Sequence, residues 1–158
     1  MQTLTLSLPG SGINNVVILG GRGNGVVRIP RGTYTISGFT AGNIPRVTNT
    51  NKRFEWQVQS KVTAADIVRI ESMIYAQEEN NALGNILIDD MTEPIPPSWL
   101  NWGSRTAIGS AITVDGVARR FFRTYGIVTI NGEFQDRFGV GADGNQWYEV
   151  QLLITEVI

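Results

Sequence analysis

Residues 54–78, FEWQVQSKVTAADIVRIESMIYAQE, decide the fold, because they hold a strand and a helix in direct succession. Phe54, Trp56 and Val58 alternate with polar residues, and this period of two predicts a half-buried strand. Thr63 then stands where a helix N-cap is expected, and Asp66 follows in the first turn, where an acid is favourable. The segment therefore predicts a strand that leads directly into a helix.

The helix is expected to cover residues 64–78 and to be the only one in the chain. Its apolar residues recur at helical spacing and form a broad stripe made of Ile67, Val68, Ile70, Ile74 and Tyr75. A stripe of that width predicts a helix packed closely on a sheet.

The other apolar segments alternate or are β-branched, so they predict strands separated by Gly, Pro and Asn turns. These strands are expected at residues 3–8, 16–19, 26–29, 33–39, 86–88, 107–114, 119–130, 133–138 and 147–157. Residues 20–25 are expected to be a hairpin tip, and Asn131-Gly132 is the strongest hairpin signal. Turns are also expected at Ala41-Gly42-Asn43 and at Asp115-Gly116. Residues 47–52 and the proline-rich segment 92–105 are expected to be irregular. The whole chain, residues 1–158, is therefore predicted to be one β-rich domain, a β-sandwich or barrel with a single flanking helix.

The composition argues against catalysis and metal binding. The chain has no histidine and no cysteine, which removes the commonest general base and the commonest metal ligands. Its acidic pairs, Glu78-Glu79 and Asp89-Asp90, stand at expected element ends, where solvated acids are normal. Glycine-rich residues 20–25 lead into a strand rather than a helix, so they do not fit a phosphate-binding loop. We expect no catalytic, cofactor or metal site.

Charge and hydropathy restrict the partners. Charged residues are 17% of the chain and the net charge is −1, so nucleic-acid binding has little support. No apolar run reaches the roughly 20 residues of a membrane span, and residues 1–10 do not resemble a signal peptide. A surface of neutral polar groups is cheap to cover, because burying charge is what costs most. This composition favours assembly interfaces.

Two groups of side chains are candidates for contact. Trp99 and Trp102 in the proline-rich segment can cap the core, anchor a protein partner or stack on a sugar. Arg119 and Arg123 share one face of their predicted strand with Phe121, so we expect inter-subunit or cross-strand pairs there.

The C-terminal strand is the third candidate. At eleven residues, 147–157, it is about twice the usual length and spans roughly 36 Å, so one end is expected to lie beyond its own sheet. Tyr148, Val150, Leu152 and Ile154 mark its buried face. The opposite face mixes apolar and neutral polar groups with a single charge at Glu149, which suits subunit contacts: Trp147, Gln151, Leu153, Thr155 and Val157. The alternative is a central strand buried on both faces within one subunit.

The order of elements resembles a known family. The alternating strand from Phe54, the helix begun by Thr63-Ala64-Ala65-Asp66, the short strand ending at Asp89-Asp90 and the long C-terminal strands are similar to the tail-tube fold. That fold builds tail tubes, distal tail proteins and baseplate hubs of bacteriophages and related contractile injection machines. The resemblance implies a non-catalytic virion protein, made in the host cytoplasm, that forms a homo-oligomeric ring (a hexamer or trimer) and contacts neighbouring tail proteins.

A rival interpretation comes from another class. A carbohydrate-binding β-sandwich, such as a receptor-recognition or lectin-like module, would use Trp99 and Trp102 as stacking surfaces. A ring without affinity for glycans would favour the structural protein, and a small glycan-binding species would favour the lectin.

Overall fold

The computed structural model describes residues 3–8, 16–20, 25–31, 34–49, 53–79, 86–101, 103–130, 135–140, 144 and 146–157. These residues are mainly β, as predicted. Their strands are β1 (Thr3–Ser7), β2 (Val16–Gly20), β3 (Gly25–Arg31), β4 (Tyr34–Phe39), β5 (Pro45–Asn49), β6 (Arg53–Thr63), β7 (Ile86–Ile95), β8 (Thr106–Val114), β9 (Val117–Ile130), β10 (Gln135–Val140) and β11 (Gln146–Glu156). The helices are α1 (Ala64–Glu79) and α2 (Pro97–Leu100).

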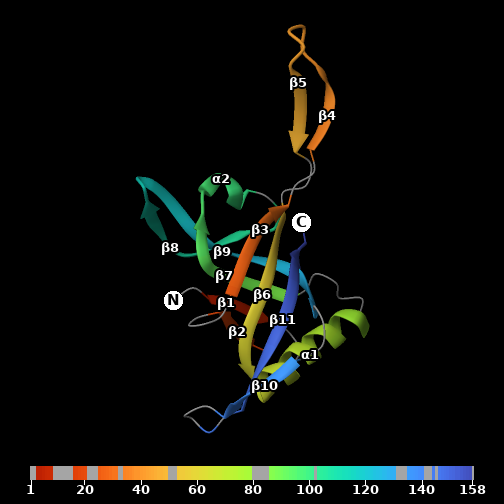
Figure 1. Cartoon of the computed structure of the whole chain (residues 1–158). Helices are drawn as coiled ribbons and strands as arrows, with labels where there is room; N and C mark the ends of the chain where they lie inside the picture. The colour runs from red at the N-terminus through yellow and green to blue at the C-terminus, as the bar shows by residue number, and fades with distance from the viewer. Residues whose placement is uncertain are drawn as a thin grey trace.

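Nine of the strands form one antiparallel sheet. Its order is β2-β1-β7-β9-β11-β6-β3, with β8 paired to β9 and β10 paired to β11. The sheet curls so that β2, at one end of this order, contacts β3 and β6 at the other (Figure 1). The sandwich or barrel of the prediction is therefore a single curled sheet, a half-barrel, with α1 lying against it.

Strand β9 connects the half-barrel to a projecting hairpin. One of its edges pairs with β7, while its other edge pairs with β11 near the C-terminal end and with β8 near the N-terminal end. The turn between β8 and β9 is Asp115-Gly116, whose φ angles of 49° and 76° are those of a tight two-residue hairpin. We call residues 106–121 the arm. The predicted turn at Asp115-Gly116 is confirmed.

Helix α1 begins and ends where the sequence predicted. The hydroxyl of Thr63 accepts a hydrogen bond from the N–H of Asp66 at 3.3 Å, which confirms the cap. Ile70 and Met73 are fully buried, but Val68 and Tyr75 are 60% and 59% exposed. The predicted stripe was too wide, since positions 68 and 75 lie seven residues apart on the flank that faces away from the sheet.

Gln77, at the end of α1, completes an edge of the sheet. Its amide donates to the carbonyl of Val128 at 2.9 Å and accepts from the N–H of Val128 at 2.8 Å. Strand β7 pairs with β9 only as far as Gly126, opposite Ile86. The side chain of Gln77 thus takes the place of β7 at Val128, where this edge of β9 has no strand partner within the described residues, and it ties the helix to the sheet.

Several predicted boundaries are wrong. Strand β7 does not stop at Asp89-Asp90 but continues to Ile95, and α2 adds a second, four-residue helix. Residues expected to be irregular form β5, which pairs with β4 as a separate hairpin. β2 pairs with β1 and β3 pairs with β6, so these two strands do not form the predicted hairpin with each other; residues 21–24 lie outside the described residues. Asn131-Gly132 lies outside the described residues.

The C-terminal strand also differs from expectation in one respect. Val150, Leu152 and Ile154 are buried as predicted, whereas Tyr148 is only partly buried. The strand does not extend beyond its own sheet, because residues from Trp147 to Thr155 pair with β6. Nor is it buried on both faces, since Gln151 is exposed and Leu153 only partly buried. The strand is core on one side and surface on the other.

Candidate interaction site

The predicted contact residues of β11 gather on one surface. Trp147, Gln151, Leu153, Thr155 and Val157 alternate with the buried residues and so face away from the core. The register places Gln59, Gln57 and Glu55 of β6 beside Gln151, Leu153 and Thr155. We call these outward residues of the two strands the amide face.

The amide face contains a shallow depression of about 260 Å³. Its outward side chains come from Val27 of β3, Gln57 and Gln59 of β6, and Gln151 of β11. The acid beside it, Glu149, is engaged by a hydrogen bond from the amide of Gln59. Neutral amides can donate to and accept from the backbone of a partner without the cost of burying a charge, so this surface suits a protein contact.

Arg119 and Arg123 lie elsewhere, on the outward side of β9. Arg123 binds Asp89 through two hydrogen bonds of 2.6 and 2.8 Å, and these bonds raise the pKa of the Arg123 guanidinium. Asp89 stands opposite Arg123 in the register, so Arg123 makes a cross-strand pair within the subunit. Arg119 has neither a hydrogen bond nor an ion pair within the described part of the chain, and its Nε atom is buried without an acceptor.

Trp99 packs on the core. Its ring centroid lies 5.8 Å from that of Phe54, and its carbonyl accepts a hydrogen bond of 2.9 Å from Arg105. This arrangement fits the core-capping alternative. Trp102 lies outside the described residues.

Sequence reasoning predicted strand β4 and the turn after it but missed β5, and therefore the hairpin that the two strands form. It stands away from the half-barrel (Figure 1), and its tip exposes Phe39 by 62% and Ile44 by 64%. The turn is closed by hydrogen bonds of 2.9 Å from the N–H of Thr40 to Ile44 and from the N–H of Asn43 to Thr40. Residues 34–45 carry no charge. A large aromatic and a large aliphatic side chain flanking a short Gly-Asn turn were the available signal.

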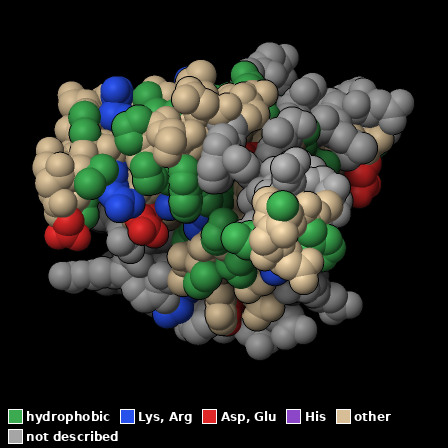
Figure 2. Space-filling model, turned by 90° about the horizontal axis from the view of Figure 1, so that it is seen from above, with side chains coloured by type: hydrophobic (Ala, Val, Ile, Leu, Met, Phe, Trp, Pro, Cys, Tyr) green, Lys and Arg blue, Asp and Glu red, His purple; other side chains and the backbone are tan. Residues whose placement is uncertain are grey.

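The arm is the second projecting surface. Every residue of β8 except Ile108 is exposed, and none of them is charged. Ile112, Val114 and Val117 are exposed by 39%, 37% and 47%. Seen from above, hydrophobic and neutral side chains make up most of the described surface and charged ones are few (Figure 2). An uncharged strand with an unpaired edge invites pairing or packing with another chain.

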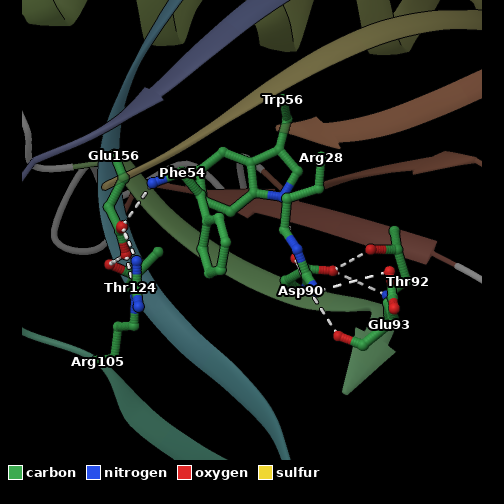
Figure 3. A network of polar contacts seen from close by, with 9 residues as sticks. All are labelled: Arg28, Phe54, Trp56, Asp90, Thr92, Glu93, Arg105, Thr124 and Glu156. Atoms are coloured by element: carbon green, nitrogen blue, oxygen red, sulfur yellow. Dashed lines mark hydrogen bonds and ion pairs between the residues drawn. The ribbon is translucent and has the colours of Figure 1, made fainter. Parts of the chain in front are cut away.

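Beneath these surfaces lies a buried ion pair (Figure 3). Glu156 binds Arg105 at 2.5 and 2.7 Å, the N–H of Phe54 at 2.9 Å and the hydroxyl of Thr124 at 2.8 Å. The Arg105 and Glu156 side chains are 0% and 1% exposed. The pair sits where the partner of β9 changes from β11 to β8, so it joins the arm to the C-terminal strand.

A second buried carboxylate, Asp90, corrects the prediction that the acids are solvated. It is 0% exposed and accepts from Arg28 at 2.8 Å, from the indole N–H of Trp56 at 2.9 Å and from both the N–H and the hydroxyl of Thr92. The sequence does not indicate that Asp90 is buried, because its partner Arg28 is 62 residues away in the chain. Strand β7 continues past Asp90 instead of ending there, because Arg28 compensates the charge of the buried carboxylate.

The arginines of the two networks lie over the same two aromatic rings, Phe54 and Phe122. The guanidinium carbons of Arg105 and Arg28 lie 4.2 and 4.6 Å from the centroid of Phe54. Each carboxylate already accepts four hydrogen bonds, which is about its full capacity. The networks therefore serve to hold strands together, and neither carboxylate has a free lone pair to offer a ligand.

Two further properties concern the described residues only. They contain no group of three or more acidic side chains placed to hold a metal ion. Neither of their helices has the length and hydrophobicity needed to cross a bilayer.

No protein-family model matches this chain, and no curated protein is significantly similar to it in sequence.

Proposed function

We propose that this protein is a non-catalytic structural subunit of a phage tail or a related injection machine, and that it forms a ring in the tail tube or baseplate hub. The ring is a homo-oligomer in the virion, a hexamer or trimer, and it contacts neighbouring tail proteins. The carrying observation is a set of surfaces with exposed apolar or neutral polar side chains that project from, or lie flat on, the half-barrel: the β4–β5 tip, the arm and the amide face.

These surfaces have the properties of contacts rather than of solvent-facing structure. Phe39 and Ile44 at the tip, and Ile112 and Val117 on the arm, leave large apolar side chains in water in a lone subunit. Exposed apolar patches of this kind mark protein interfaces, and ring closure covers strand edges that a monomer leaves open. The amide face adds a broad neutral surface that a neighbour can cover at low cost.

The tail-tube type of fold is part of the proposal. A curled antiparallel sheet with one substantial helix against it supports this type, as does a long C-terminal strand beside the strand that precedes the helix. The resemblance in element order and the exposed apolar and neutral surfaces support the same function by independent reasoning.

Native mass spectrometry and negative-stain electron microscopy of the purified chain test the proposal. We expect closed rings of a single subunit number. A chain that remains monomeric, or that forms open aggregates without a defined stoichiometry, would contradict the ring.

The carbohydrate-binding alternative has lost support from Trp99, whose ring packs against Phe54. A glycan array is the matching measurement: specific glycan binding by a non-ring species would reverse the preference between the two functions.

A further inference from the structure

The side of α1 that faces away from the sheet carries two apolar residues around an acid. Val68, Glu71 and Tyr75 are exposed and stand three and four positions apart, so they lie in one row along the helix. The carboxylate of Glu71 makes neither a hydrogen bond nor an ion pair within the described part of the chain. We call these three residues the α1 stripe. It presents an acid between two large apolar side chains.

The outward face of the arm carries the same pattern around a base. Phe122 is fully buried on the inward side of β9. Because side chains alternate along a strand, Val117, Arg119 and Phe121 face outward. Ile112 of β8 stands opposite Arg119 and shares this face. The guanidinium of Arg119 has no acceptor within the described residues, and its Nε atom is buried without one.

The two patterns also match in length. Val117 and Phe121 stand four positions apart on β9, which is roughly 13 Å along a strand. Val68 and Tyr75 stand seven positions apart on α1, which is roughly 10 Å along a helix. A strand laid along the stripe therefore brings apolar side chains onto apolar side chains while its central base meets the central acid.

One subunit cannot make this contact with itself. The arm and α1 lie on opposite sides of the half-barrel (Figure 1). Gln77 of α1 binds Val128 of β9, and nine positions of the strand separate Val128 from Arg119, which is roughly 30 Å. The two complementary faces can therefore meet only between copies of the chain.

We infer that the outward face of the arm of one subunit packs along the α1 stripe of the next subunit, with Arg119 paired to Glu71. The contact joins two different surfaces, so each subunit keeps a free arm or a free stripe for a further copy, and the row continues until it closes. The inference rests on the proposed function for the closure of the ring, and it deepens that function by naming the surfaces that meet.

Charge complementarity selects a second copy as the occupant of both faces. An apolar partner would bury Glu71 or Arg119 without compensation, which is costly. A partner of like charge would be repelled from either face. Another copy of the chain supplies the opposite charge at the centre of the pattern and apolar side chains on both flanks.

Charge reversal tests the contact. Glu71→Arg sets two bases against each other in every contact, and Arg119→Glu sets two acids. We expect each variant to weaken self-association by about tenfold or more, measured by sedimentation velocity over a concentration series. The double variant Glu71→Arg/Arg119→Glu should recover it, because each contact again joins an acid and a base. Circular dichroism checks folding, and Glu71→Arg alone remains decisive if Arg119→Glu does not fold, because position 71 is exposed.

An equimolar mixture of the two single variants adds a second readout. When the variants alternate around a ring, every contact pairs an acid with a base, whereas two neighbours of the same kind repel. A hexamer should therefore reappear in native mass spectra with three copies of each variant. A trimer cannot alternate, so its mixture should give mixed dimers but no closed trimers. Arg31→Glu, a reversal at an exposed base that belongs to neither face, is the control and should assemble as the wild type does.

The outcomes separate this contact from the ring. If the single reversals assemble as the wild type does, or if the double variant recovers nothing, the contact between the arm and α1 is wrong, while the ring is judged on its own images. Open rows that obey the charge rules but never close would support the contact and contradict the ring of the proposed function. A wild-type chain that is monomeric at every concentration contradicts both.

Discussion

The half-barrel and the projecting hairpins of this protein are both built from antiparallel strands, but the strands of the two regions differ in how far they are buried. In the half-barrel, β6 buries every second residue from Phe54 to Val62, and buried arginine–carboxylate pairs tie distant strands together. In the arm, β8 buries none of its residues and carries no charge. The comparison teaches that the half-barrel buries its apolar residues within one subunit, while the arm and the β4–β5 tip leave theirs exposed, as surfaces that bind another chain do.

The largest expected loss of stability comes from a substitution in α1, which packs on the half-barrel. Ile70→Asp places a charge at a fully buried position and should cost several kcal/mol, enough to unfold the half-barrel. Val68→Asp is the matched control two positions away, where the side chain is 60% exposed, and it should change stability by less than about 0.5 kcal/mol. Urea denaturation followed by circular dichroism measures both. Equal midpoints for the two variants would show that the helix does not face the sheet as described.

The next largest loss of stability is expected from the buried Arg105–Glu156 pair, which joins the half-barrel to the arm. Arg105→Ala leaves Glu156 buried with only the N–H of Phe54 and the hydroxyl of Thr124 as donors, so it should cost about 3–5 kcal/mol. The control removes an exposed pair of the same type: Arg123→Ala, whose side chain is 46% exposed, should cost at most about 1 kcal/mol.

Guanidinium denaturation compares these two variants directly. If Arg123→Ala lowers the free energy of unfolding as much as Arg105→Ala does, then burial does not make the Arg105–Glu156 pair matter more than an exposed pair. If both variants lower it only slightly, then solvent reaches Glu156.

The sequence predicted the half-barrel better than its extensions. Alternation at Phe54, Trp56 and Val58 and the cap at Thr63 depend only on neighbours in the chain, and both were confirmed. The type I′ turn at Asp115-Gly116 was equally local. The buried side of β11 was also predicted, but its last member, Glu156, was not recognised, although an acid at a buried-face position indicates a buried cation nearby.

The failures concern features set by distant residues. Asp90 resembles the end of a strand until Arg28 and Trp56 are brought to it by pairing across the sheet. Residues 20–25 resemble a hairpin because the sequence does not show that β2 and β3 lie at opposite ends of the strand order. Of the candidate contact residues, five share the outward side of β11 and two lie on β9, an arrangement that only the register reveals.

The C-terminal strand shows why a substitution is a better test than a truncation. Ending the chain after Leu152 removes Ile154, which is fully buried, together with Glu156 and nearly all pairing between β11 and β9. The truncated chain is therefore expected to unfold whether or not the strand also serves assembly. Changes confined to surface positions avoid this ambiguity, since they leave the core and its ion pairs intact.

The smallest expected effect on stability, and the clearest on assembly, comes from the β4–β5 tip. Phe39 is 62% exposed, so Phe39→Glu should change the free energy of unfolding by less than about 0.5 kcal/mol. If a neighbouring subunit covers the tip, the same change buries an unpaired charge in the interface and should disrupt the ring. Ala41→Glu, in the same turn and also exposed, is the matched control for added charge outside the apolar pair. Thermal melting and native mass spectrometry separate the two readouts. A Phe39→Glu variant that is fully folded and still forms wild-type rings would show that the tip is not part of the ring contact, whereas loss of rings without loss of stability would place the tip in the interface and complete the contrast with Ile70.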